Sequence, residues 1–297
     1  MDLSPVLVFC YKRLDSLQKT IDSLKSNHLS EETELFIFSD GNKNDLDKSS
    51  VEEVRKFIRH IKGFKRIIIT ENKVNIGLAN NIISGVTKII SERDSVIVLE
   101  DDLIISENFL QYMNQALSFY RGDDRVFSIS GYTPNLKKKE YSFDTYFTNR
   151  SSSWGWATWK KEWMGVDWSM EAFDRLTLTQ RFGLRIMGSD FSSLLKKQKK
   201  GKIDSWAVRF CFHQYLNKSI SVFPVISKIQ NIGFGDDLAT HTGMKDDRFY
   251  TVLDISGKDL FKFRSMDLGI NVIMNSQFLY YYGLRARLLS KIKNLFL

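Results

Sequence analysis

Short apolar segments alternate with helical patterns through the N-terminal part of the chain, and this alternation constrains the fold more than any other feature. The apolar segments span residues 5–10, 34–40, 66–70 and 95–99. Between them, apolar side chains recur at helical spacing in residues 14–24, 51–61 and 78–90. Continuous apolar strands separated by amphipathic helices are typical of a parallel sheet covered on both faces. The pattern predicts an α/β fold with a mostly parallel central sheet.

Polar residues follow three of the four predicted strands at the point where each strand ends. These segments are Tyr11-Lys12-Arg13, Ser39-Asp40-Gly41 and Glu100-Asp101-Asp102. In open α/β sheets, ligands bind outside the carboxyl ends of the strands. The sequence therefore predicts a ligand site to which these three segments contribute.

The acidic segment at residues 100–102 is the most informative of the three. Three consecutive carboxylates at the end of a buried strand repel one another and lose solvation, unless a cation or hydrogen-bond donors offset the charge. A hard divalent ion that also holds a diphosphate would do so, since Mg²⁺ and Mn²⁺ prefer oxygen ligands. The alternative is a solvated acidic turn before the next helix, near Ser106 or Glu107.

The second half of the chain is less regular and rich in aromatic residues. A helix is expected at residues 108–120 and a strand at 126–129, ending at Gly131. All six tryptophans follow this point. We place a boundary near residue 131 and expect three parts: residues 1–131, residues 132–250 and a C-terminal extension at residues 251–297.

The order of the motifs resembles that of GT-A (Rossmann-like) glycosyltransferases of the family 2 type, over about the first 245 residues. The resemblance is carried by VFCYKR after the first strand, by FIFSDG, by Asn75-Ile76-Gly77-Leu78-Ala79-Asn80, and by the strand that leads into Glu100. It implies a transfer of a hexose from a nucleotide-diphosphate sugar, with a UDP-sugar as the default donor and Mn²⁺ or Mg²⁺ as cofactor.

The same resemblance assigns roles to individual residues. Asp102 would bind the metal, Asp101 would face the ribose or the water shell of the metal, and Asp40 would contact the nucleobase. The donor would be bound by the residues of the matching motifs, namely Tyr11, Arg13, Asp40, Asn75, Gly77, Asn80, Glu100 and Asp101.

The second half is similar to the N-acetylglucosaminyltransferase that initiates complex N-glycans and to its bacterial relatives. The similarity is carried by Ser153-Trp154-Gly155-Trp156, Asp204-Ser205-Trp206, Phe234-Gly235 and Thr240-His241. That enzyme has an Asp one residue before an Asp-Trp pair and a Ser-His-Gly downstream. This chain departs from both patterns, with Asp204-Ser205-Trp206 and Thr240-His241-Thr242, so the substrate stays open.

This part of the resemblance implies that Asp204 is the catalytic base of an inverting transfer, which needs a base near the acceptor hydroxyl. It also places His241 near the metal or phosphate, and Trp154 and Trp156 as stacking surfaces for a sugar. The alternatives from the residues alone are Asp204 as the N-cap of a helix at residues 205–215, a structural histidine, and core tryptophans. Retaining transfer also stays open.

Two other functions compete with a glycosyltransferase. A sugar nucleotidylyltransferase shares the α/β plan, but it needs a glycine-rich loop after the first strand to hold a triphosphate. The chain has Tyr11-Lys12-Arg13-Leu14 there, without glycine. A non-catalytic sugar- or nucleotide-binding protein on the same fold is the other alternative.

Charge and targeting patterns bear on location. The formal net charge is +8, and the tail at residues 284–297 combines basic residues with apolar ones at helical spacing. Such a helix lies on an anionic membrane surface or packs on its own domain. The charge is otherwise dispersed, which disfavours nucleic acid. No signal peptide or membrane span is recognisable, and Cys10 and Cys211 suit buried, reduced thiols.

These patterns together predict a cytoplasmic enzyme with peripheral contact to the inner face of the plasma membrane. Its acceptor would be a glycan or a lipid-linked glycan, as in the assembly of bacterial surface polysaccharides such as O-antigen or capsule.

Overall fold

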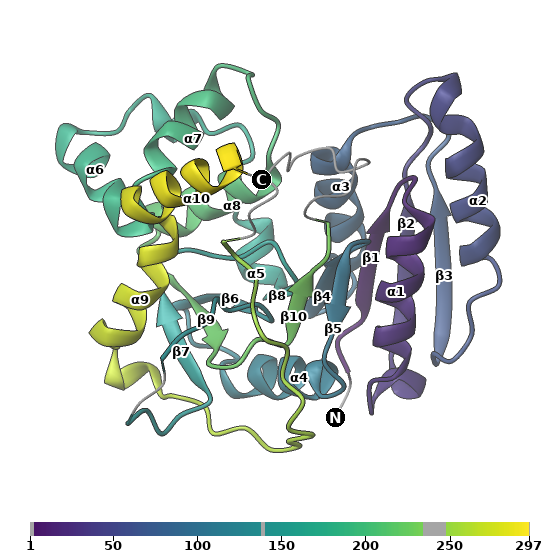
Figure 1. Cartoon of the computed structure of the whole chain (residues 1–297), viewed down its shortest axis with the longest axis horizontal. Helices are drawn as coiled ribbons and strands as arrows, with labels where there is room; N and C mark the ends of the chain where they lie inside the picture. The colour runs from purple at the N-terminus through teal and green to yellow at the C-terminus, as the bar shows by residue number, and fades with distance from the viewer. Residues whose placement is uncertain (1–2, 138–139, 234–247, 297) are drawn as a thin grey trace.

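The computed structural model describes residues 3–137, 140–233 and 248–296. Within them, one eight-stranded sheet has the strand order β3-β2-β1-β4-β8-β6-β9-β7, and β10 pairs with β5 in a separate two-stranded sheet. The large sheet runs through the centre of the molecule (Figure 1). The fold is therefore mixed α/β, as the sequence predicts.

The first four strands form the parallel part of the sheet. They are β1 (Val6–Cys10), β2 (Glu34–Ser39), β3 (Arg66–Glu71) and β4 (Ser95–Glu100). The helices between them are α1 (Leu14–Lys25), α2 (Lys48–Ile58) and α3 (Leu78–Ile90). All seven elements were predicted; α2 begins at Lys48 and ends at Ile58, earlier at both ends than the apolar spacing indicated. In Figure 1, β1 rises from the N-terminus at the bottom, so the carboxyl ends of these strands lie at the top.

The second half of the chain extends the same sheet. Its strands are β6 (Val126–Ser130), β7 (Thr145–Thr148), β8 (Trp156–Trp159) and β9 (Ile220–Pro224). β8 is antiparallel to β4 and to β6, whereas β6 and β9 are parallel. The sheet is thus parallel in its first half and mixed in its second. The domain limits at residues 131 and 250 stay a prediction.

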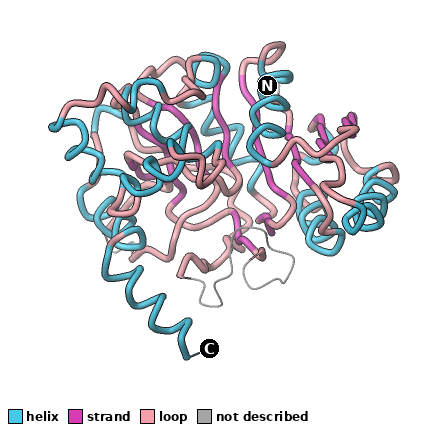
Figure 2. Tube along the Cα trace, turned by 90° about the horizontal axis from the view of Figure 1, so that it is seen from above, coloured by secondary structure: helices cyan, strands magenta, loops and turns pink. Residues whose placement is uncertain are grey.

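Alternating side chains of each strand enter two different cores. On β1, Val6 and Val8 join α1, α2 and α4 (Phe109–Phe119) on one face. Leu7 and Phe9 join α3, α5 (Lys160–Met164) and α8 (Trp206–Leu216) on the other face. Helices therefore lie on both sides of the strands when the molecule is seen from above (Figure 2). Because both faces are buried, the strands need the uninterrupted apolar runs seen in the sequence.

The remaining elements lie around the large sheet and the helices that cover it. They are β5 (Leu103–Ile105), α6 (Leu178–Gly183), α7 (Phe191–Lys199), β10 (Ile229–Asn231), α9 (Val272–Tyr282), α10 (Leu284–Phe296) and the short 3-10 helices Ser30–Glu32, Asp45–Asp47, Glu171–Phe173, Leu184–Met187 and Met266–Leu268.

Two predictions about the chain as a whole can be assessed from these elements. Cys10 and Cys211 are buried free thiols, as predicted. No helix in the described ranges has the length and apolar character needed to span a bilayer.

Candidate active site

The acidic segment lies at the carboxyl end of β4, next to the end of β1. Phe9 of β1 pairs with Glu100 of β4, so the residues that follow the two strands face one another. The Arg13 guanidinium accordingly donates a hydrogen bond to Asp101 Oδ1 and another, of 3.0 Å, to Asp102 Oδ2. Asp101 is 4% exposed. The alternative of a solvated acidic turn is therefore wrong, because Arg13 and the strand ends enclose these carboxylates.

One oxygen of Asp102 is left without a partner. Asp102 Oδ1 is buried and makes no hydrogen bond with any described group. Gly233 lies so close to the other oxygen, Oδ2, that a β-carbon at this position would overlap it. Position 233 therefore requires glycine, because any larger residue would collide with Asp102.

This unpartnered oxygen suits a hard cation, because Mg²⁺ and Mn²⁺ take carboxylate oxygens as ligands. In the ranges that the structure describes, no group of three or more His, Cys, Asp or Glu residues forms a metal site by itself. A cation at Asp102 would therefore take most of its ligands from water or from a substrate, as Mg²⁺ commonly does with phosphates.

The electrostatics of the acidic segment reflect its crowding. Burial raises the pKa of Glu100 to about 8, and repulsion by Asp102 and Asp101 adds to the effect. Burial also raises the pKa of Asp101 to about 6, although Arg13 opposes this shift. Burial alone would lower the pKa of Arg13, but attraction to Asp101 and Asp102 raises it. The strand end thus holds more negative charge than Arg13 alone neutralises.

Asp40 organises the neighbouring loop from a buried position. Its Oδ1 accepts hydrogen bonds from the backbone N–H of Gly41 (3.0 Å) and of Ile76 (3.1 Å) and from Asn72 Nδ2 (3.1 Å). Its Oδ2 accepts one from Gly77 N–H at 3.0 Å. Three of these four donors share Oδ1 and one binds Oδ2, so most of the accepting capacity of the carboxylate is used within the loop. Asp40 thereby fixes the backbone after β3.

The other predicted donor residues surround the same loops. Asn75 Nδ2 donates to Gly41 O at 2.8 Å, and Asn80 Nδ2 donates to Ile76 O at 3.0 Å. Gly77 has a φ of +79° and precedes α3, so its conformation suits glycine.

Tyr11 fastens the loop after β2 to the end of β1. Its hydroxyl donates to Asp47 Oδ2 at 2.7 Å and accepts from Lys43 N–H at 2.9 Å. The loops after β1, β2 and β3 are therefore joined to one another by hydrogen bonds.

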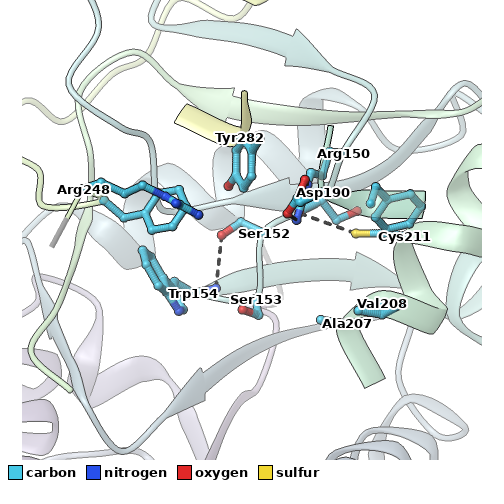
Figure 3. A pocket seen from close by; sticks show the side chains of 13 residues that line it. Arg150, Ser152, Ser153, Trp154, Asp190, Ala207, Val208, Cys211, Arg248 and Tyr282 are labelled. Carbon is cyan, nitrogen blue, oxygen red and sulfur yellow. Dashed lines mark hydrogen bonds and ion pairs between the residues drawn. The ribbon is translucent and has the colours of Figure 1, made fainter. Parts of the chain in front are cut away.

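A pocket of about 210 Å³ lies in the second half of the chain. Its walls include Ser152, Ser153 and Trp154 before β8, Ala207 and Val208 of α8, and Arg150, Asp190, Arg248 and Tyr282 (Figure 3). We call it the Trp154 pocket. β4 and β8 are antiparallel, with Val98 opposite Trp156. A β-carbon on Gly155 would lie 3.4 Å from Leu99 Cδ2, so the segment that leads from the pocket into β8 passes close to the end of β4.

The two tryptophans expected to bind a sugar have different surroundings. Trp154 is half-buried, lines the pocket, and makes edge contacts with Tyr132 and Phe249 at ring-centroid distances of 4.6 and 5.8 Å. Trp156 is 1% exposed and stacks on Trp206 at 4.7 Å. The expectation of a sugar-binding surface at Trp156 is therefore corrected: this side chain is core and packs with Leu7 and Phe9. Trp154 packs against the core on the other face of the sheet, because Gly155 between the two has a φ of +56° and interrupts the alternation of the strand.

Asp204 precedes α8 with a side chain that is 59% exposed and an ion pair to Arg209 of 2.7 Å. The cap of α8 is Ser205, whose hydroxyl accepts from Val208 N–H. The alternative of Asp204 as N-cap is thus wrong. No described contact joins Asp204 to the acidic segment, and its role as base stays a prediction. His241, together with Phe234, Gly235, Thr240 and Thr242, lies outside the described residues.

Sequence reasoning missed most of the charged lining of the Trp154 pocket. Arg150 and Asp190 form a two-bond ion pair of 2.7 and 3.1 Å, and Arg248 and Tyr282 come from later segments. The polar run Arg150-Ser151-Ser152-Ser153 directly before Trp154 was the available signal. Asp190, Arg248 and Tyr282 carry no local pattern that connects them to it.

Comparisons with known proteins complete the description. The sequence pattern of the family described as Glycosyl transferase family 2 matches residues 6–180. No curated protein matches the sequence.

Several solved structures are similar. The mannosyltransferase PcManGT from Pyrobaculum calidifontis, in complex with GDP-Man and Mn²⁺, is 12% identical over 55% of this chain and 49% of its own, with a TM-score of 0.36. Residues 1–349 of S. aureus TarS are 9% identical over 77% of this chain and 60% of their own, with a TM-score of 0.41. A cytidylyltransferase from Leptospira borgpetersenii is 12% identical over 66% of this chain and 73% of its own, with a TM-score of 0.34. The chain thus spans about half of the mannosyltransferase and three fifths of the TarS fragment.

The counter-ion role of Arg13 can be tested by Arg13→Met. Removing one partner of a buried ion pair costs about 3 kcal/mol of unfolding free energy. With Arg13 present, the folded-state pKa values of Glu100 and Asp101 are raised to about 8 and about 6, although Arg13 lowers both. Removing Arg13 raises both pKa values further, so the variant loses additional stability relative to the unchanged protein as pH rises above about 6. We expect urea unfolding in EDTA to give a larger deficit at pH 8 than at pH 5.

Arg59→Met is the matched control, because Arg59 pairs with Glu71 and Glu52 on the surface and should matter little. Equal stability of Arg13→Met and the unchanged protein at pH 8 would contradict the role of Arg13.

Proposed function

The chain belongs to glycosyl transferase family 2 and has the GT-A fold, and from this premise we propose that it transfers a sugar from a nucleotide-diphosphate donor to an acceptor hydroxyl. The observation that carries the proposal is the buried Glu100-Asp101-Asp102 segment at the carboxyl end of β4, where Asp102 Oδ1 lacks a partner. In open α/β sheets this edge is where ligands bind.

The metal site of the proposal is Asp102. Its unpartnered oxygen would hold Mn²⁺ or Mg²⁺, which when bound stabilises the charge that develops on the nucleotide diphosphate. Arg13 already contacts Asp102 Oδ2 at 3.0 Å, so its guanidinium lies where a diphosphate would arrive. Asp101, held by Arg13 and by the N–H of Tyr11 at 3.3 Å, would orient the site on the ribose side.

The nucleotide half of the proposal rests on the joined loops after β1, β2 and β3. Since four donors of the surrounding loops bind the carboxylate of Asp40, we assign it an indirect role: it shapes the loop that carries Asn75 and Gly77. Tyr11 and Asn80 border the same space. A uracil base is our preferred ligand here, so the proposed donor is a UDP-sugar.

For the acceptor half we propose inverting transfer with Asp204 as general base. Ala207 and Val208, on the first turn of α8, line the Trp154 pocket, and Asp204 lies just before that turn. Its ion pair with Arg209 would orient the carboxylate. The base accepts the proton of the attacking hydroxyl, and the hydroxyl oxygen replaces the nucleotide diphosphate at the anomeric carbon.

The location in the proposal is the inner face of the plasma membrane, with a lipid-linked glycan acceptor of bacterial surface polysaccharide assembly. It is supported by α10, on which Leu284, Leu288, Leu289 and Ile292 are 71%, 60%, 53% and 43% exposed. The helix projects from the body in Figure 2. The helix packs on the protein through Ala286 and Ser290, which are 7% and 2% exposed. The exposed apolar residues on its other side, beside Arg and Lys, suit an anionic bilayer surface.

The donor and metal proposal is tested by a hydrolysis panel of nucleotide sugars with Mn²⁺ or EDTA. We expect one UDP-sugar to turn over only with metal. Asp102→Asn should lose the Mn²⁺ dependence of UDP binding in calorimetry, because one metal ligand is gone. Asp94→Asn, an exposed acid just before β4 (80% exposed), is the control. Metal-independent turnover by the unchanged protein would refute the metal site, and UDP binding without any turnover would favour a binding protein.

The base is tested by Asp204→Asn, which removes the proton acceptor and little volume. We expect UDP affinity to stay unchanged while transfer falls by about 10²-fold or more, the usual range for a general base. Asp174→Asn is the matched control, because Asp174 is 65% exposed and also forms an ion pair, in its case with Lys199. Full turnover by Asp204→Asn would exclude Asp204 from the mechanism.

The membrane contact is tested by Leu288→Gln/Leu289→Gln and by a chain that ends at Gly283. We expect cosedimentation with phosphatidylserine vesicles to fall at least several-fold in both, since apolar area drives interfacial binding. Leu178→Gln is the control, because Leu178 is 86% exposed on α6. If both altered proteins sediment as well as the full chain, α10 is not the contact.

A further inference from the structure

The Trp154 pocket has an uneven distribution of charge. Arg150 and Asp190 neutralise each other through two hydrogen bonds of 2.7 and 3.1 Å. The guanidinium of Arg150 also lies over the ring of Tyr282, 4.0 Å from its centroid. Arg150 is therefore fully engaged within the wall of the pocket.

Arg248 is a second arginine in the same wall, and its situation differs. Its Nε is buried and has no hydrogen-bond partner among the described groups. Its guanidinium lies 4.6 Å from the centroid of the Phe249 ring. Figure 3 shows the side chain pointing into the space between Trp154 and Tyr282. A buried donor without an acceptor is costly, so this position indicates a ligand group that supplies one.

The charges around Arg248 also favour an anionic ligand. Burial lowers its pKa, and the positive charges of Arg287 on α10 and Arg150 act in the same direction, while Asp190 opposes them. Among the described lining residues Asp190 is the one acid, and it is already paired with Arg150. The described part of the pocket therefore has an excess of positive charge.

Resting on the proposed transfer, we propose that the Trp154 pocket binds an acidic sugar of the acceptor, whose carboxylate or phosphate pairs with Arg248 while its ring lies against Trp154. The guanidinium matches both anions in geometry, since its N–H groups form a planar fork. The pocket volume of about 210 Å³ is below the usual range for drug-sized ligands and suits a single sugar ring. The hydroxyls of Ser152 and Ser153 offer polar contacts along one wall.

Neutral acceptors fit this arrangement less well. A sugar with hydroxyls alone would displace water from Arg248 and offer it only uncharged oxygen atoms as hydrogen-bond partners. Such oxygens bind a guanidinium more weakly than an anion does. The phosphates of the donor are the competing anion, because the segment that leads from the pocket into β8 passes close to the end of β4. Binding in the presence of UDP separates the two, since an acceptor pocket remains open when the donor site is filled.

The test is a titration of the full chain, saturated with UDP and Mn²⁺, by ligand-observed NMR. The probes are methyl glucuronoside and glucose 6-phosphate as carboxylate and phosphate, and methyl glucoside as neutral sugar. We expect one or both acids to bind about tenfold tighter than the glucoside, and this preference to vanish in Arg248→Met. Arg248→Lys, which keeps the charge, should retain part of it.

Arg185→Met is the matched control, since Arg185 also lies over a ring, that of Phe182, at 4.2 Å, but outside the pocket. Equal binding of acidic and neutral sugars, or an acid preference that survives in Arg248→Met, overturns the proposal, as does displacement of the acids by UDP. These failures differ from failure of the proposed transfer, which would appear as absent metal-dependent binding of UDP.

Discussion

The contact between Arg13 and the carboxylates of Asp101 and Asp102 is the interaction on which the rest of the site depends. Three acidic residues at the end of a buried strand are costly unless a cation or hydrogen-bond donors lie nearby. The parallel pairing of β1 with β4, which sets Phe9 opposite Glu100, brings that cation from the loop after β1. The topology of the sheet therefore places a positive charge beside the negative charges at the end of β4. Within the described residues, Asp102 Oδ1 remains buried without a hydrogen-bond partner.

The central strand β4 also connects the two halves of the molecule. On one edge it is parallel to β1, and on the other it is antiparallel to β8. The first pairing assembles the acidic segment, and the second brings the segment that contains Trp154 close to the end of β4. The proposed donor and acceptor sites can therefore share one strand end without a hinge between separate sheets. This arrangement accounts for a site whose residues come from distant parts of the sequence.

Local periodicity predicted the first half of the fold well, because the apolar side chains of its strands and helices recur in a regular way. It could not distinguish Trp154 from Trp156, since residues i and i+2 of a regular strand share a face. Gly155 between them has a φ of +56°, so one side chain enters the core while the other reaches the pocket. The acidic segment was found because its charge is anomalous in sequence. The Arg150–Asp190 pair and Arg248 were not, since tertiary packing alone unites them. Likewise, the hydrogen bonds that Asp40 accepts from the backbone and from Asn72 depend on a loop conformation. The spacing of residues in the sequence does not predict that conformation.

Tyr282 ends α9 as part of the pocket wall, and a single residue, Gly283, separates it from the first turn of α10. If α10 rests on a bilayer, the depth and tilt of that helix set how far the opening stands above the lipid headgroups. Because Gly283 alone separates α10 from the wall of the Trp154 pocket, the distance between pocket and membrane would then limit the length of a lipid-linked glycan that can reach the pocket. Lipid composition would in this way select among acceptors of different length without any change in the residues that touch them.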